Sequence, residues 1–198
     1  MVQEKHEVGK KIAVLIIIPL EFQYNAAPSS RVWHISRELN SSGIKSIIVA
    51  RKAVSDSITG GDIIAIKPLV NRGFIGNLLF LFQISVVVMR VLFNAKIERV
   101  LAMGYSLAPL FLILKLWGKN ITYDFNGYRY KEQIVEGHRL RAKITRLFDW
   151  LALKLADRIL VIREELCQDL PPNFQKKTLL LPNGVDLEEF STPEDKIY

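Results

Sequence analysis

The sequence predicts an α/β fold, a doubly wound and mostly parallel sheet of about seven strands with helices on both faces. Short apolar runs rich in Ile, Val and Leu alternate with longer amphipathic segments along the 198 residues. Strands that are separated by helices pair in parallel through right-handed crossovers. A hydrophobic content of 49% at this length supports one substantial core rather than two domains of ordinary size.

The expected strands are the short apolar runs that end in turn-forming residues. They lie at residues 12–18, 46–50, 62–66, 99–103, 121–124, 159–162 and 178–181. The first run follows Lys10 and Lys11, which is the charge order of a signal peptide. Its nine apolar residues contain Pro19 and are followed at once by Glu21, so a buried parallel strand is favoured.

The expected helices lie between these strands, at residues 30–41, 75–93, 107–117, 139–156 and 164–170. The segment 74–93 is long enough for a bilayer, which requires roughly twenty residues. It contains Gln83, Ser85 and Arg90, and charge inside hydrocarbon is costly. A buried or surface-attached helix is therefore favoured over a membrane span.

The amino-acid composition limits the classes of binding partner expected for this chain. The excess of 27 Lys and Arg over 20 Asp and Glu gives a net charge of +7, which favours anionic surfaces such as phospholipid or polyphosphate. No nucleic-acid motif is present, so no nucleic-acid partner is expected. A single cysteine, Cys167, excludes an internal disulfide and indicates the cytoplasm. His6, His34 and His138 are far apart in sequence, and no metal site is expected.

The turn after the first strand leads into a helix through Pro28, Ser29, Ser30 and Arg31. Ser29 or Ser30 is a suitable N-cap. Unpaired amides and the helix dipole would attract an anion there, and Arg31 would add positive charge. Plain capping and ligand binding both remain open. The absence of Gly-x-Gly-x-x-Gly and Walker patterns argues against a common dehydrogenase or P-loop enzyme.

Polar residues also follow later strands, at the sheet edge where open α/β proteins bind ligands. Asp124 could orient an acceptor hydroxyl or accept its proton, which makes it the candidate catalytic residue. Asp124 with Asn126 and Gly127 is equally compatible with an Asx-type turn. Asn183 and Gly184, after the last strand, have the same two interpretations.

The segment 139–156 has two unlike faces at helical spacing. The face expected to pack on the sheet contains Leu140, Ile144, Leu147, Phe148, Leu151 and Leu155. The opposite face contains Arg139, Lys143, Arg146, Trp150, Leu153 and Lys154. Cations interleaved with tryptophan suit an anionic membrane surface, whereas a solvated face or a protein contact is the alternative.

Several motifs in this order resemble the N-terminal domain of family-4 glycosyltransferases. They are Pro28-Ser29-Ser30-Arg31 with His34 and Ser42-Gly43, then Tyr123-Asp124-Phe125-Asn126-Gly127-Tyr128, Ala156-Asp157-Arg158-Ile159-Leu160-Val161-Ile162, and Asn183-Gly184-Val185-Asp186. Ile44 stands where the family usually has histidine, and Arg163 where it has serine.

This resemblance implies a Rossmann-like domain that forms the N-terminal half of a GT-B fold. The domain would span residues 10–186, after a flexible N-terminus at 1–9 and before the start of an interdomain linker at 187–198. The implied residues of the acceptor cleft are Pro28, Ser29, Ser30, Arg31, Asn126, Gly127, Tyr128, Arg163, Glu164, Asn183, Gly184 and Asp186.

The implied reaction is transfer of a sugar from a nucleotide-sugar donor, with retention of configuration, to a glycan or lipid-linked acceptor. Catalysis would need a C-terminal donor domain, supplied in cis or in trans, and no tightly bound cofactor. Two hypotheses follow. The chain is the first domain of a glycosyltransferase in glycan, polysaccharide or glycolipid synthesis, or it is a non-catalytic acceptor-binding or scaffolding subunit. Either would be cytoplasmic or peripheral on the inner face of the membrane.

Overall fold

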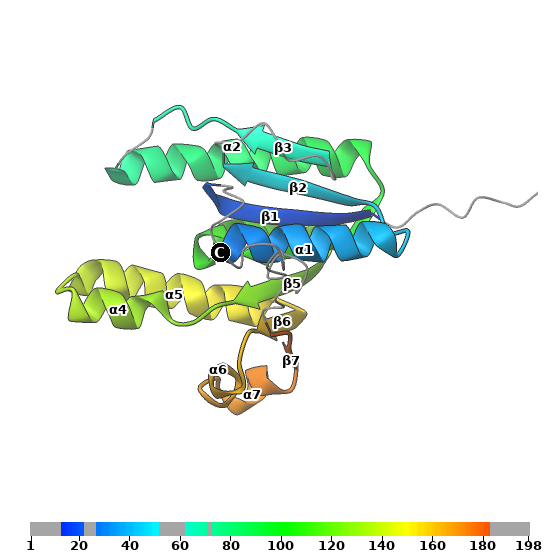
Figure 1. Cartoon of the computed structure of the whole chain (residues 1–198). Helices are drawn as coiled ribbons and strands as arrows, with labels where there is room; N and C mark the ends of the chain where they lie inside the picture. Colours follow the sequence, from blue (N-terminus) through cyan, green and yellow to red (C-terminus); the bar gives the residue numbers. More distant parts are fainter. Residues whose placement is uncertain (1–12, 22–26, 52–61, 71–72, 183–198) are drawn as a thin grey trace, which may run out of the picture.

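A computed structural model describes residues 13–21, 27–51, 62–70 and 73–182. Its centre is a sheet with the strand order β3-β2-β1-β4-β5-β6-β7, in which every neighbouring pair is parallel (Figure 1). The strands are β1 (Ala13–Glu21), β2 (Ser46–Arg51), β3 (Asp62–Ile66), β4 (Ile97–Met103), β5 (Asn120–Phe125), β6 (Arg158–Val161) and β7 (Thr178–Leu180). The predicted fold class and all seven predicted strands are confirmed.

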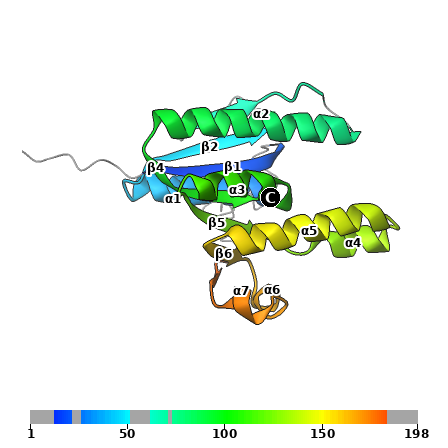
Figure 2. The ribbon, with the colours of Figure 1, turned by 180° about the vertical axis from the view of Figure 1, so that it is seen from behind.

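Helices cover both faces of the sheet. The helix α1 (Ala27–Ser41) lies on the front face in Figure 1, whereas α2 (Gly73–Asn94), α3 (Ala108–Leu116) and α5 (Arg139–Leu155) lie on the face turned to the viewer in Figure 2. A 3-10 turn, η1 (Tyr105–Leu107), precedes α3, and α4 (Arg129–Val135) packs against α5. The short helices α6 (Glu164–Gln168) and α7 (Pro172–Gln175) connect β6 to β7. Two hydrophobic cores result, one on each face of the sheet.

The strand β1 is central because it is apolar on both faces. Its residues Leu15, Ile16, Ile17 and Ile18 are fully buried, and they contribute alternately to the two cores. From β1 the chain winds outward through β2 to β3, and α2 then returns it to β4 on the other side of β1. The strand order therefore reverses between β1 and β4, which makes that gap the topological switch point of the sheet.

The long apolar helix α2 is the crossover from β3 to β4. Its segment Gly76–Asn94 is long and apolar enough to cross a membrane. In the structure Phe80, Ile84, Val88 and Leu92, spaced four apart, are buried in the core on one face of the sheet. The predicted helix is thus present, and one face of it packs on the sheet.

The predicted orientation of α5 is right only in part. Phe148, Leu151 and Leu155 pack against the core as predicted, and the predicted outer cations and Trp150 are exposed. The buried residues of α5 are Ala142, Thr145, Asp149, Ala152 and Leu153, although Leu153 was expected on the outer face. Small side chains on this side let α5 pack closely against α3, η1 and α4. The leucine-rich face consequently points outward, with Leu140, Ile144 and Leu147 exposed by 74%, 44% and 58%.

The predicted N-cap of the first helix is also wrong. The helix α1 begins at Ala27, before the expected start, so Ser29 and Ser30 lie inside its first turn. Ser29 is buried there. A serine within the helix is not positioned as the extended residue that caps it from outside.

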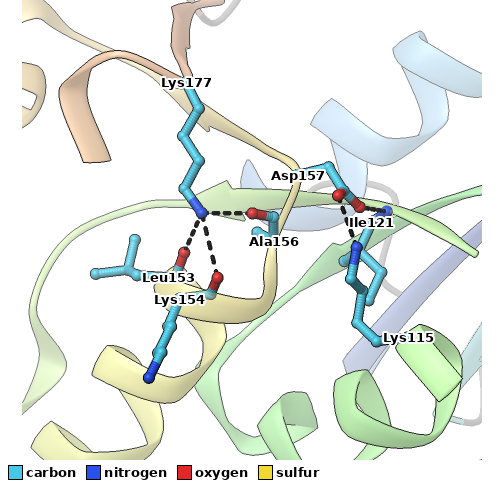
Figure 3. Close-up of polar contacts among 7 residues, drawn as sticks. All are labelled: Lys115, Ile121, Leu153, Lys154, Ala156, Asp157 and Lys177. Carbon is cyan, nitrogen blue, oxygen red and sulfur yellow. Dashed lines mark hydrogen bonds and ion pairs between the residues drawn. The ribbon is translucent and has the colours of Figure 1, made fainter. Parts of the chain in front are cut away.

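The motif Ala156-Asp157 connects α5 to β6, at the amino end of that strand (Figure 3). The Lys177 ammonium donates to the carbonyl oxygens of Leu153, Lys154 and Ala156 at 2.7, 3.4 and 2.5 Å. It thereby satisfies carbonyl groups that the end of a helix leaves unpaired.

The carboxylate of Asp157 accepts from the Lys115 ammonium at 2.7 Å and from the Ile121 amide at 2.8 Å (Figure 3). These hydrogen bonds and the Lys115 charge hold the pKa of Asp157 below its usual value, despite the opposing effect of burial. The motif joins α3, β5 and β6, and its role here is structural.

Replacing Lys177 with methionine should lower the free energy of unfolding by about 1–3 kcal/mol, because three carbonyl acceptors lose their donor. Burial lowers the pKa of Lys177, so its side chain is partly desolvated. The neighbouring Lys176 is exposed, and Lys176→Met should change stability by less than about 0.5 kcal/mol. Urea unfolding of both variants checks this, and equal effects would contradict the capping role.

Candidate functional site

A cleft of about 330 Å³ opens at the switch point of the sheet. We call it the switch-point cleft. Its lining residues come from the carboxyl ends of β1, β4 and β5, from the start of α1, and from η1 and α4. It is lined by Pro19, Leu20, Pro28, Met103, Gly104, Tyr105, Ser106, Tyr123, Asp124, Asn126, Gly127, Arg129 and Glu132. Crevices at this position in open α/β sheets are where such proteins bind ligands.

A buried ion pair borders the cleft. The Nε of Arg31 donates to one oxygen of Asp124 at 2.8 Å, and a terminal nitrogen reaches the other oxygen at 3.4 Å. Another guanidinium nitrogen of Arg31 donates to the carbonyl oxygen of Pro182 at 3.4 Å. Arg31 therefore connects the start of α1 with the carboxyl ends of β5 and β7.

Burial raises the pKa of Asp124, while the hydrogen bond and the charge of Arg31 oppose that rise. The carboxylate is engaged by Arg31 from outside the turn, so its contacts go beyond those of a simple Asx turn at Asn126 and Gly127. Arg31, which was expected to offer its charge to an anion, is instead neutralised by this carboxylate.

Two glycines shape the cleft. Gly104, directly after β4, has a φ of +97°, and a Cβ atom there would lie 3.1 Å from the Pro19 ring. Gly127, in the turn after β5, has a φ of +128°. Both conformations disfavour other residues, and the approach of Gly104 to Pro19 brings the ends of β4 and β1 together.

A buried polar layer adjoins the cleft. Asp149 of α5 and Gln133 of α4 are each 1% exposed, and among the described residues none hydrogen-bonds to their side-chain polar atoms. Burial raises the pKa of Asp149 to about 7. Burial also raises the pKa of Tyr123 well above its usual value, and the nearby charge of Asp149 adds to that rise. Tyr123 lines the cleft, so this layer lies against the site.

The structure brings together only some of the residues predicted from sequence. Pro28, Asp124, Asn126 and Gly127 line the switch-point cleft. Ser30 and Arg31 line a second hollow of about 600 Å³ beside α1, together with His34 and Pro182 among others.

The other predicted residues lie elsewhere. Tyr128 packs edge-on against Phe125, with ring centroids 4.9 Å apart, and is not among the residues lining either hollow. Arg163 and Glu164 are exposed at the start of α6, beyond the carboxyl end of β6. Asn183, Gly184 and Asp186 lie outside the described residues.

Several cleft residues were not predicted. Gly104, Tyr105 and Ser106 follow the apolar run of β4, and the rule that selected Asp124 after β5 would have selected them too. Arg129 and Glu132 come from α4, which was not predicted as a helix. They form an ion pair with each other, and Glu136 lies 3.7 Å from Arg129.

In the described part of the chain, no three His, Cys, Asp or Glu side chains gather as metal ligands. No protein-family model matches the sequence, and no curated protein matches it.

Solved structures, by contrast, share the fold. Sucrose-phosphate synthase from Thermosynechococcus elongatus matches with a TM-score of 0.74 and 12% identity, over 93% of this chain and 54% of that one. A glycosyltransferase from Rickettsia africae ESF-5 matches at 0.55 and 14%, over 93% and 47%. UDP-GlcNAc 2-epimerase from Methanocaldococcus jannaschii matches at 0.59 and 14%, over 85% and 45%.

The fold is thus the Rossmann-like α/β domain found in proteins of GT-B architecture. The chain spans about half the length of each of these structures.

Proposed function

We propose that this chain is the acceptor-binding, N-terminal half of a retaining family-4 glycosyltransferase. The observation that carries the proposal is the switch-point cleft, which lies where β1, β4 and β5 end in a fold shared with glycosyltransferases. The sequence motifs of that family support the finer assignment, because Pro28, Asp124, Asn126 and Gly127 all border this cleft.

The chemistry of the lining favours an acceptor over a donor. A nucleotide-sugar diphosphate needs cations or helix N-termini directed at it. Arg129, the cation that lines the cleft, is paired with Glu132, and the adjoining Arg31 is paired with Asp124. The lining includes Tyr105 and Ser106, which carry hydroxyl groups, and Asn126, which carries an amide. Such neutral groups suit the hydroxyls of a sugar or of a lipid-linked glycan.

Within this proposal Asp124 is the catalytic residue. The residue lines the cleft, its carboxylate is buried against Arg31, and burial raises its pKa, which suits a group that exchanges a proton with an acceptor hydroxyl. Its oxygens accept from Arg31, so the carboxylate would act from a fixed position. The residue would also orient Arg31 beside the bound acceptor.

Turnover in this proposal requires a donor domain, in cis or in trans, which brings the nucleotide-sugar to the cleft. The reaction is assigned to glycan, polysaccharide or glycolipid synthesis in the cytoplasm, with no metal. A non-catalytic acceptor-binding subunit is the second candidate. The same neutral lining of the cleft favours this candidate. It differs from the first proposal because the bound acceptor would not be glycosylated through a donor domain.

Ligand-observed NMR on the purified chain tests acceptor binding, with methyl hexosides, short oligosaccharides, and UDP- and GDP-sugars as probes. We expect saturation transfer to glycosides and none to nucleotide-sugars. Ser106→Trp fills the cleft and should abolish the signal. Ser41→Trp, at an exposed position near the end of α1, is the matched control and should retain it.

Strong nucleotide-sugar binding without glycoside binding would overturn the acceptor assignment. Equal glycoside signals from the wild-type chain and Ser106→Trp would show that the switch-point cleft is not the site. Circular dichroism melting of both variants separates loss of binding from loss of folding.

A further inference from the structure

We propose that the outward face of α5 docks on the surface of an anionic lipid bilayer. The inference stands apart from the proposed acceptor site, since it rests on a different surface. It starts from the finding that the leucine-rich face of α5 points away from the protein.

The apolar part of this face consists of Leu140, Ile144, Leu147 and Trp150, with Trp150 exposed by 47%. We call it the α5 apolar stripe. Monomeric proteins seldom leave large apolar side chains in a row on one helix face, and such a row marks an interaction surface. The core contacts of α5 are made by other residues, among them Leu153, Phe148 and Leu151, so the stripe is not needed to fill the core.

Positive charge flanks the stripe. Arg139, Lys143, Arg146 and Lys154 are exposed, and the one acidic residue of α5, Asp149, is buried on the inner side. Lys154 lies over the Trp150 ring at 4.8 Å, at the boundary between the basic and apolar zones. A helix with apolar residues on its outward face and cations beside them is built to lie in the interface of an anionic membrane.

The helix α3, which packs beside α5, also exposes apolar side chains. Leu112, Ile113 and Leu116 of α3 are exposed, and Trp117 contacts the exposed Phe93 edge-on at 4.8 Å. These helices lie on one face of the sheet (Figure 2). On the opposite face, α1 presents Arg37, Glu38 and Ser41 to solvent instead. The two faces of the domain therefore differ in what they can bind.

The positive charge beside the α5 apolar stripe favours an anionic bilayer over a second copy of this chain as the partner of this face. A second copy of this chain would bring Arg139, Lys143 and Arg146 against their own equivalents, and like charges would repel. An anionic bilayer offers negative headgroups to the cations and hydrocarbon to the stripe at the same time. Glu132 of α4 and Glu136, which follows that helix, form ion pairs with Arg129. Within the described part of the chain, no acidic side chain pairs with the cations of α5.

Vesicle flotation with the full chain tests the proposal. We expect binding to vesicles that contain phosphatidylglycerol, little binding to pure phosphatidylcholine, and weakening between about 0.1 M and about 1 M salt. Reversing three cations in R139E/K143E/R146E should reduce partitioning at least about tenfold. The matched control is K96E/R99E/R158E, which changes the net charge equally at exposed positions outside α5 and should bind nearly as well as the wild-type chain.

The double variant L140S/L147S separates insertion from plain electrostatic attraction. It keeps every cation, so its loss of binding supports burial of the stripe in the bilayer. Both leucines are exposed, and thermal melting should be little changed. Quenching of tryptophan fluorescence by brominated lipid should be seen in the wild-type chain and be much weaker in Trp150→Phe.

Three results would overturn the proposal. The first is that the wild-type chain does not bind anionic vesicles. The second is that the control K96E/R99E/R158E loses binding as fully as the α5 variant. Alternatively, light scattering shows a dimer that L140S/L147S dissociates while vesicle binding is unchanged, which would assign the stripe to a protein interface.

Discussion

Replacing Arg31 with methionine is expected to lower the free energy of unfolding by about 3–5 kcal/mol, because Asp124 is left charged and unpaired inside the protein. Arg31 and Asp124 are 8% and 1% exposed, so water cannot replace the lost partner. The double variant R31M/D124L removes both charges and should recover much of that loss. Urea unfolding of the wild-type chain, the two single variants and the double variant measures the coupling.

An exposed arginine on the same helix provides the matched control. Arg37 lies 4.0 Å from Glu38 at the surface, and Arg37→Met should change stability by less than about 1 kcal/mol. If the effects of Arg31→Met and Asp124→Leu on the free energy of unfolding simply add, the two side chains have no coupling energy. That result would contradict a stabilising role of the buried ion pair.

Replacing Asp149 with asparagine should stabilise the protein increasingly as the pH rises. Burial raises the pKa of Asp149 in the folded state to about 7, above its value in the unfolded chain. Unfolding therefore releases a proton between about pH 4 and pH 7, and the wild-type contribution declines across that range. The pH-dependent gain in unfolding free energy of Asp149→Asn over the wild-type chain reaches about 4 kcal/mol by pH 8, at about 1.36 kcal/mol per pKa unit.

The measurement is the difference in unfolding free energy between Asp149→Asn and the wild-type chain at pH 5, 6, 7 and 8. The difference should grow up to about pH 7 and then become constant. Asp169, an exposed carboxylate 3.2 Å from Lys131, is the control, and Asp169→Asn should show little pH dependence over this range. A difference for Asp149→Asn that does not change with pH would mean that Asp149 titrates normally.

The positions of the strands could be predicted because each is a short apolar run. Burial on both faces demands such a run in the central strand β1, and the edge strand β7 keeps an apolar run although Leu179 and Leu180 are exposed. The helix α4 could not be predicted in this way. Its deeply buried residue is Gln133, and it has no apolar periodicity to indicate a helix. The cleft residues Arg129 and Glu132 were missed with it.

The orientation of α5 shows a second limit. Its apolar periodicity is strong, and periodicity usually identifies the face that packs inward. Here Ala142 and Ala152 allow a close approach to neighbouring helices, and that packing depends on partners far away in the sequence. A helix with two usable faces can be assigned only when its neighbours are known. The ion pair of Arg31 with Asp124 could not be predicted from the sequence either, although each residue was named as a candidate site residue.

The contacts of Arg31 also bear on the order in which the chain folds. They span 93 residues to Asp124 and 151 residues to Pro182, so they can form only when distant strands have been assembled. Interactions that form after the rate-limiting step leave the folding rate nearly unchanged and slow unfolding. The pair would then slow unfolding and leave the folding rate nearly unchanged. Stopped-flow measurements on Arg31→Met should therefore show the lost stability as a higher unfolding rate.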